Sequence, residues 1–199
     1  MIQDTGVKEQ LIDATLLSEG ERDELIRLGI LSEEGLIQSA PIHPTERSII
    51  QKQAVQAPEV LNDAFDYSPI PSSFSRGLAF ELNGYKILLI SGTASVDENG
   101  KSIHVGDFRA QCWRTYRNIT ALLESEGMTW QDVVRTTCYL RDIERDYKDF
   151  NEIRTAFLNW QHLDPLPAST GIQARLCREN LLVEIDAVAI CPSSSTKGR

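Results

Sequence analysis

Residues 167–190 read PASTGIQARLCRENLLVEIDAVAI and hold the pattern from which the architecture of this chain can be worked out. The pattern predicts two strands, near 170–177 and 181–190, joined by a polar turn. Glu184 stands inside the apolar run of the second strand. A carboxylate in a buried strand costs free energy unless it has a partner or a task, so Glu184 is the first candidate functional residue.

The segments before this stretch alternate between strand and helix patterns. Asn83-Gly84 is a strong hairpin signal between two short apolar runs. Asp107 is suited to cap a helix, and Gly127 is suited to end it. The predicted elements are strands over 75–82 and 86–91, a helix over 107–126, a strand over 133–140 and a second amphipathic helix marked by Tyr147, Phe150, Ile153, Phe157 and Trp160.

The predicted element order is ββαβαββ, and a further short strand in the 94–103 loop is an open alternative. This order favours an α+β sandwich in which a mixed sheet carries two long helices on one face. The opposite face also needs a cover, because an isolated two-layer monomer would leave many apolar strand residues in water. We expect a neighbouring subunit to cover that face, and the uncovered monomer is the alternative.

Residues 1–71 read differently from the rest and form an expected N-terminal extension. Ser18 and Glu21 make a capping box, and apolar residues follow at helical spacing, which predicts a short helix ending near Gly29. We expect the extension to be partly helical and to pack on the main domain or on a neighbouring subunit, rather than to be disordered. The main domain is expected over 72–192 and a flexible tail over 193–199.

The composition argues against several classes of function. The 199 residues include 20 Lys and Arg against 29 Asp and Glu, a net charge of −9, whereas nucleic-acid binding depends on a basic surface. No apolar run approaches the roughly 20 residues of a membrane span, and the N-terminus lacks a signal-peptide pattern, so we expect a cytoplasmic protein with no membrane or nucleic-acid partner. Neither a metal nor a cofactor is expected, since the three histidines do not neighbour a cysteine and the four scattered cysteines suit free buried thiols.

Seven segments of the chain are informative through their order and spacing, although none of them is diagnostic by itself. They are SFSRG (73–77), LISGTASVDENG (89–100), GDFRAQ (106–111), the NI..LL...G pattern (118–127), DVVRTTCYLRDI (132–143), YKDFNEIRTAF (147–157) and P.STGIQARL....LVEIDAVA (167–189). Together they resemble the Rid family (YjgF-type, reactive-intermediate deaminases), some of whose members carry the label endoribonuclease L-PSP. The resemblance covers about residues 72–190 and implies a chorismate-mutase-like fold, usually a homotrimer with clefts between subunits.

The resemblance also implies an activity, the hydrolysis of enamines and imines such as 2-aminoacrylate and its imine to keto acids and ammonia. This chemistry needs an arginine to grip the substrate carboxylate, a placed water, and a carboxyl group to orient the water or carry protons. Glu184 matches the family's acid. The other matching positions are Gly171 beside the backbone after Thr170 for a polar backbone contact, Asn151 and Ser91 for pocket or pocket-supporting residues, and Phe74 where a tyrosine usually stands.

The chain departs from the deaminases at Ser169. It reads Pro-Ala-Ser-Thr over 167–170, where the deaminases carry Pro-Ala-Arg-Ser, so the usual carboxylate-binding guanidinium is absent from this position. Arg76 is one candidate substitute, because it lies two residues after Phe74 and so on the same face of a regular strand. Arg175, on the strand after Ser169, is the other candidate. For each arginine, a solvated surface charge is the alternative interpretation.

Several functions remain open. The first is a Rid-like hydrolase that acts on a small carboxylate-bearing metabolite at clefts between subunits, with Glu184 handling water or protons. The second is a trimer that binds such a metabolite without turning it over, which the changes at Ser169 and Phe74 favour. A chorismatase-like hydrolase is less favoured because the chain is short, and an RNA-directed translation inhibitor is less favoured because the net charge is −9.

Overall fold

The computed structural model describes residues 17–36, 38, 50–63 and 73–193, which fall in two compact units, 1–49 and 50–199. The first unit contains α1 (Glu19–Arg27), and its capping box pairs the Ser18 hydroxyl with the Glu21 N–H and the Glu21 carboxylate with the Ser18 N–H. Gly29 follows at φ 71°, a left-handed conformation that glycine adopts without strain. The short helix predicted from the capping box is confirmed. The expected tail lies outside the described residues apart from Ser193.

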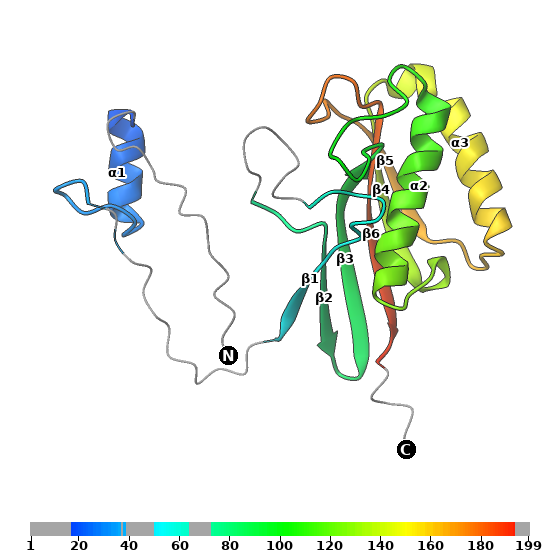
Figure 1. Ribbon diagram of the computed structural model, residues 1–199, viewed down its shortest axis with the longest axis horizontal. Coiled ribbons are helices and arrows are strands. Elements are labelled where there is room, and N and C mark those ends of the chain that lie inside the picture. Colours follow the sequence, from blue (N-terminus) through cyan, green and yellow to red (C-terminus); the bar gives the residue numbers. More distant parts are fainter. Residues whose placement is uncertain (1–16, 37, 39–49, 64–72, 194–199) are drawn as a thin grey trace. The chain divides into compact units, whose positions relative to one another are not determined.

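The second unit is built on one six-stranded sheet, shown in Figure 1 beside two long helices. The strand order is β1-β2-β3-β6-β4-β5, and all neighbours are antiparallel except β4 and β5, which are parallel. The sheet is therefore mixed, as predicted. Its strands are β1 (Lys52–Val55), β2 (Gly77–Leu82), β3 (Tyr85–Ala94), β4 (Val133–Leu140), β5 (Ala168–Gln173) and β6 (Val183–Pro192), and the helices are α2 (Phe108–Ser125), α3 (Ile143–Trp160) and the short 3₁₀ helix η1 (Trp130–Asp132).

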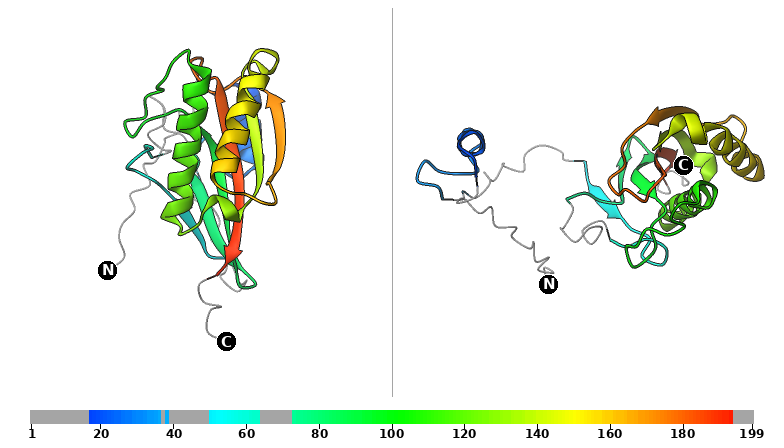
Figure 2. Two further views of the ribbon diagram at one scale, coloured as in Figure 1. Left: turned by 90° about the vertical axis from the view of Figure 1, so that its right-hand side faces the viewer. Right: turned by 90° about the horizontal axis from the view of Figure 1, so that it is seen from above.

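Both long helices lie against the same face of the sheet, as Figure 2 shows. The alternation of side chains along β6 reflects this arrangement. Val183, Ile185 and Ala187 are buried beneath the helices, whereas Glu184 and Asp186 alternate with them and are only partly buried on the other face. The α+β sandwich with two long helices on one face is confirmed.

Local sequence signals set several ends of these elements. Asn83 (φ 50°) and Gly84 (φ 80°) both adopt left-handed backbone conformations in the tight turn between β2 and β3. Asp107 caps α2 by accepting a hydrogen bond from the Ala110 N–H at 2.9 Å. The hairpin and the helix start are where the sequence predicts them.

Two features of the sheet differ from the sequence-based expectation. β5 and β6 are not joined as neighbours by a polar turn, because β4 lies between them and pairs with β5 in parallel. The physical reason is that the polar residues of β5 are all exposed and suit an edge, whereas the apolar alternation of β6 suits the centre of a sheet. In addition, β1 falls within the segment expected to be an extension, yet it pairs with β2, so residues 52–55 contribute to the sheet.

The face of the sheet opposite the helices, called here the outer face, is rich in exposed apolar side chains. On β2, β3 and β6 they project alternately with the buried residues of the same strand. Within 50–63 and 73–193 no helix covers them. Apolar strand residues in water are unfavourable, so this face meets the condition under which a second chain is expected to pack on the sheet. The exposed residues are Leu82, Tyr85, Leu89, Ile172 and Ile190.

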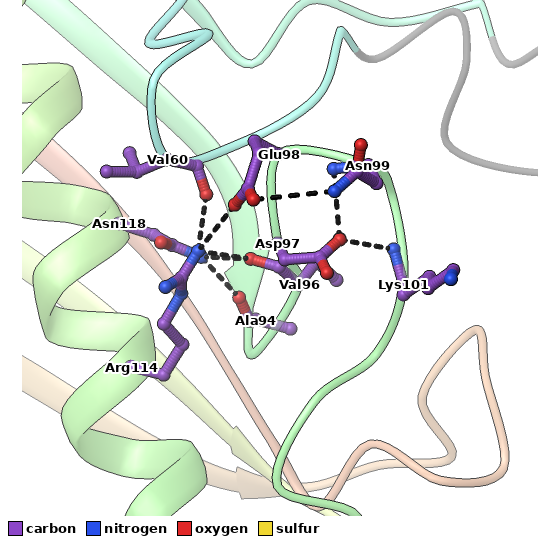
Figure 3. A network of polar contacts seen from close by, with 9 residues as sticks. All are labelled: Val60, Ala94, Val96, Asp97, Glu98, Asn99, Lys101, Arg114 and Asn118. Carbon is purple, nitrogen blue, oxygen red and sulfur yellow. Dashed lines mark hydrogen bonds and ion pairs between the residues drawn. The ribbon is translucent and has the colours of Figure 1, made fainter.

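A buried polar network joins α2 to the segment before β2 and to the end of β3 (Figure 3). Asn118 is fully buried, and its Nδ2 donates to the carbonyl oxygens of Ala94 at 3.0 Å and Val96 at 2.9 Å. Arg114 Nη2 donates to the Val60 carbonyl oxygen at 2.6 Å. The network therefore fixes the segment around Val60 against α2 and against the chain that leaves β3.

The loop that follows β3 is closed by Asp97. Its Oδ1 accepts hydrogen bonds from the N–H groups of Asn99 at 3.0 Å and Lys101 at 2.8 Å (Figure 3). An isolated β-bridge joins Val96 to Ser102 in the same loop, where a short strand was an open alternative. The structure thus has a bridge there rather than a full strand.

The four cysteines are free, but they are not all buried. Cys112 and Cys138 are buried and Cys191 is partly buried. The expectation of a buried thiol is wrong for Cys177, which is exposed because it lies in the polar connection between β5 and β6. None of the described helices has the length and apolar character needed to cross a membrane.

Replacing Asn118 by alanine should destabilise the fold. The substitution removes the two buried hydrogen bonds that Asn118 Nδ2 donates to the Ala94 and Val96 carbonyl oxygens, and each such bond contributes about 0.5–1.5 kcal/mol. Urea unfolding followed by circular dichroism should show a lower midpoint with an unchanged slope. Asn99→Ala, at an exposed position of the same region, is the control and should stay within about 0.5 kcal/mol of the wild type. Equal stabilities of the two variants would contradict the structural importance of the network.

Candidate functional site

Glu184 lies in the middle of the sheet and projects on the outer face. Its backbone is paired with Ala94 of β3 on one side and with Tyr139 of β4 on the other. The carboxylate rests directly over Gly92, where a Cβ atom would overlap Glu184 Oε1 and lie 3.2 Å from Cγ. Glycine at position 92 therefore allows the close approach, and any side chain there would displace the Glu184 carboxylate.

The surroundings of Glu184 favour the protonated form of its carboxyl group. Burial raises the pKa of Glu184, the negative charge of Asp186 raises it further, and the positive charge of Arg76 lowers it by less. Asp186 is itself held in place by hydrogen bonds from the Tyr139 hydroxyl at 2.9 Å and the Thr137 N–H at 3.1 Å. A carboxyl group with a raised pKa holds a proton more readily than an exposed glutamate does, which suits a group that must both accept and donate a proton.

Arg76 is buried, with 2% of its surface exposed. Its guanidinium donates from Nε to the Asn62 carbonyl oxygen at 2.9 Å and from Nη2 to Asn62 Oδ1 at 2.8 Å. It also lies 5.5 Å from the centre of the Phe74 ring. A solvated surface charge does not describe this residue. Its charge acts on Glu184 instead, since it lowers the pKa of that carboxyl.

Ser91 supports Arg76 from the neighbouring strand. Its N–H donates to the Arg76 carbonyl oxygen at 3.0 Å, and its hydroxyl donates to the Ser75 carbonyl oxygen at 2.7 Å. Both bonds hold the start of β2 against β3. Four predicted site residues therefore belong to one group on the outer face, called here the Glu184 cluster: Glu184, Arg76, Phe74 and Ser91.

A second group of predicted residues surrounds a pocket of about 300 Å³ between α3 and the strands β4 and β5. Ser169 Oγ accepts hydrogen bonds there from Thr136 Oγ1 at 3.0 Å and from Arg154 Nη1 at 3.2 Å. Arg154 also donates to Asn151 Oδ1 and lies 5.2 Å from the centre of the Phe150 ring. Ser169 and Arg154 line this cavity, called here the Arg154 pocket, and Asn151 is connected to it through its hydrogen bond with Arg154, a residue that was not predicted.

Arg154 is absent from the candidates that the motifs indicate. The signal was present in the sequence, because a residue three positions after Asn151 on a helix lies on the same helical face. The spacing along the helix does not reveal where β5 lies relative to α3. The parallel pairing of β5 with β4 is what brings Ser169 beneath that face of α3.

The sheet separates the Glu184 cluster from the Arg154 pocket. Ser169 is paired with Thr136, and Thr136 is paired with Ala187, whose side chain is buried beneath the helices. Paired residues project on the same face, and Glu184 is an odd number of residues from Ala187, so it projects on the opposite face. Glu184 of a single chain therefore does not face the pocket that Ser169 lines.

The remaining predicted residues divide between the two faces and the surface. Gly171 shares the face of Ser169 and lines the Arg154 pocket. Thr170 faces the other way, and its hydroxyl accepts a hydrogen bond from Arg135 Nη2 at 3.3 Å. Arg175 lies beyond β5, where its side chain is 85% exposed and 4.0 Å from the Glu179 carboxylate. Of the two candidate arginines, Arg76 is the one whose charge acts on Glu184.

Cys138 lines the Arg154 pocket without the features of an activated nucleophile. Burial raises the pKa of its thiol, and the opposing effects of hydrogen bonding to Ser169 and Thr136 are smaller. The thiol therefore stays protonated near neutral pH. In the described part of the chain, no three His, Cys, Asp or Glu side chains gather in a way that could hold a metal ion.

Known proteins match the chain over the region that contains both groups. The family model described as Endoribonuclease L-PSP matches residues 72–191. A protein named 3-aminoacrylate deaminase RutC, from Acinetobacter baylyi, is 31% identical over 52% of this chain and 78% of its own length. A protein named 2-iminobutanoate/2-iminopropanoate deaminase, from Salmonella typhimurium, is 26% identical over 52% of this chain and 79% of its own length.

A solved structure agrees with these matches at the level of the fold. RidA from the Antarctic bacterium Psychrobacter sp. superposes with a TM-score of 0.55 at 24% identity, over 70% of this chain and 99% of that one. The family model spans more than half of the chain and includes every described strand except β1 and the very end of β6. The chain therefore belongs to the endoribonuclease L-PSP family, the Rid family that its sequence segments resemble.

Proposed function

We propose that this protein is a cytoplasmic homotrimer that binds a small carboxylate-bearing metabolite at clefts between subunits and hydrolyses its enamine or imine form to a keto acid and ammonia. The observation that carries the proposal is Glu184, a half-buried carboxyl group in a central strand whose pKa is raised by burial and by Asp186. The relatives named as deaminases of 3-aminoacrylate and of 2-iminobutanoate/2-iminopropanoate support the choice of substrate class.

In the proposed reaction one carboxyl group transfers the two protons of a water molecule, one after the other, to the substrate nitrogen. Ionised Glu184 accepts a proton from water as the water oxygen bonds to the imine carbon. The protonated carboxyl donates this proton to the nitrogen, which completes a carbinolamine. The carboxylate then takes the proton of the carbinolamine hydroxyl and passes it to the amino nitrogen as the C–N bond breaks, so that the products are ammonia and the keto acid. An enamine enters the same route once a proton on its carbon has converted it to the imine. A carboxyl whose pKa is raised serves both steps better than an exposed glutamate would.

The division of the sheet favours a site that is shared between chains. Glu184 and Ser169 project on opposite faces, so a ligand that touches both needs two copies of the chain. The apolar residues Leu89, Ile172 and Ile190 are exposed on the face of Glu184. A contact that brings a second chain to Glu184 would also remove these side chains from water.

A protein that binds the metabolite without turning it over is the second candidate. Ser169 stands where the deaminases carry arginine, and Phe74 stands where they carry tyrosine. Each change removes a polar contact to the substrate. Turnover distinguishes the candidates, because a binding protein is stabilised by the keto acid and releases it unchanged.

Glu184→Gln should abolish imine hydrolysis and leave the fold intact. Glutamine keeps the shape of the side chain but cannot accept the proton from water, so the rate should fall about 100-fold or more. The measurement is release of ammonia and pyruvate from 2-aminoacrylate generated in situ. Gly92→Ala should also lose activity, because the added methyl displaces the flexible Glu184 side chain rather than the backbone.

Glu144→Gln, at an exposed position on α3, is the matched control and should keep the wild-type rate. A wild-type rate in Glu184→Gln would remove Glu184 from the mechanism. If the wild-type protein accelerates the hydrolysis of no imine across several amino-acid-derived substrates, the hydrolase is excluded and the binding protein is favoured.

Glu184→Gln should also change how stability depends on pH. Because the folded pKa of Glu184 lies above the unfolded value of about 4.3, its contribution to stability is complete below that value and is lost as pH rises through the folded pKa. Glutamine has no such proton to lose. The melting temperature of the variant minus that of the wild type should therefore increase from acidic to neutral pH. A difference that does not vary with pH would contradict the raised pKa.

The proposed trimer should have three times the mass of one chain when light scattering follows size-exclusion chromatography. Leu89→Asp places a charge on the outer face and should shift the mass towards that of one chain, because an unpaired charge is costly in an apolar contact. Val105→Asp, at an exposed residue in the loop before α2, should leave the mass unchanged. A single-chain mass for the wild-type protein would exclude a site shared between subunits.

A further inference from the structure

Arg154 is a half-buried arginine whose observed partners are neutral. Its guanidinium donates to Ser169 Oγ and Asn151 Oδ1, and no Asp or Glu forms an ion pair with it in the described part of the chain. The arginines nearby are neutralised instead, since Arg109 is paired with Asp149 and Arg145 with Asp146. A partly desolvated positive charge without a counter-charge favours the binding of an anion.

The guanidinium of Arg154 is held in place by two hydrogen bonds, but not all of its N–H donors are used. Ser169 on β5 and Asn151 on α3 each accept one of its five N–H groups, and the Phe150 ring lies 5.2 Å away. The remaining N–H groups of the guanidinium can therefore make a bidentate contact with a carboxylate. Its charge also reaches into the Arg154 pocket, because it opposes the rise in the pKa of Cys138 that burial causes.

The size and lining of the Arg154 pocket limit what it can hold. A volume of about 300 Å³ is at the small end of the range for ligand sites. Leu158, Leu166 and Ile185 line it with apolar surface, and the Ser169 and Thr136 side chains add hydroxyl groups. The pocket suits one small molecule with an acidic head and an apolar side chain.

We propose that Arg154 is the carboxylate-binding residue of this protein and that the Arg154 pocket takes a 2-oxo or 2-imino acid with a branched or aromatic side chain. The guanidinium that strand β5 does not carry at position 169 is delivered from α3, and it reaches the same position through its bond to Ser169 Oγ. The short serine side chain leaves room for Arg154, and an arginine at 169 would compete with it. This inference rests on the proposed function for the identity of the acid, but its test measures binding separately from turnover.

The probe is 4-methyl-2-oxopentanoate, and its binding to the full chain is measured by isothermal titration calorimetry. Arg154→Gln should weaken binding about tenfold or more, because charged hydrogen bonds to the carboxylate are lost. Arg109→Gln, at an exposed arginine on α2, should bind as the wild type does. The neutral 4-methyl-2-oxopentanamide should bind the wild type weakly and lose little more in Arg154→Gln. Pyruvate, which lacks the apolar side chain, should bind less tightly than the probe.

A variant that exchanges the two residues tests whether lost binding merely reflects a damaged fold. Arg154→Ser alone should lose the probe, and Arg154→Ser combined with Ser169→Arg should regain it, because the second change returns a guanidinium to the pocket from β5. In the turnover assay, Arg154→Gln should raise KM far more than it lowers kcat, since the residue binds the carboxylate and does not move the proton.

The outcomes separate this inference from the proposed function. Equal affinity of the wild type and Arg154→Gln for the probe, or no binding of the probe by the wild type, overturns the role of Arg154 whatever the turnover assay shows. Binding that depends on Arg154 in a protein that hydrolyses no imine supports the inference and removes the hydrolase.

Discussion

The position of β6 between β3 and β4 is the constraint on which both halves of the site depend. A central strand has neighbours on both sides, so its side chains must project alternately on the two faces of the sheet. Ile185 and Ala187 are thereby buried beneath the helices, and Glu184 and Asp186 are forced onto the outer face. The adjoining strands limit the access of water to Glu184, and Gly92 leaves the space that its carboxylate occupies. The raised pKa of Glu184 follows from this placement rather than from any one contact.

A chain of contacts links the stability of the fold to this carboxylate. Arg114 on α2 donates a hydrogen bond to Val60, and two residues later Asn62 accepts two hydrogen bonds from the buried guanidinium of Arg76. Arg76 in turn moderates the pKa of Glu184. The segment before β2 thus contributes to the electrostatics of the site, although it has no proposed catalytic role. β1 and the residues after it accordingly belong to the same compact unit as the rest of the sheet.

The two faces of the sheet carry opposite chemistry, and that asymmetry suits the proposed assembly. Two carboxyl groups, Glu184 and Asp186, project on the outer face, whereas the guanidinium of Arg154 lies on the helix side beside Ser169. When two different surfaces of the same chain bind each other, successive copies can form a closed ring, and a trimer is one such ring. In the proposed trimer, an acid held by Arg154 of one chain would meet the proton-carrying group of its neighbour.

The sequence by itself determined the family, most of the helices and strands, and the place of one acid, Glu184, within an apolar strand. Those features depend on local signals: the capping box at Ser18, the Asn83-Gly84 turn, the periodic apolar residues of α2 and α3, and one acid in an apolar strand. Only the tertiary structure decided that β4 separates β5 from β6, that Ser169 and Glu184 project on opposite faces, and that Arg76 is buried against Asn62. It also brought Arg154 of α3 within hydrogen-bonding distance of Ser169 on β5. The physical reason is that strand pairing joins residues far apart in the chain, and a shift of one residue in register reverses every side chain, so no local pattern specifies which side chains share a cavity.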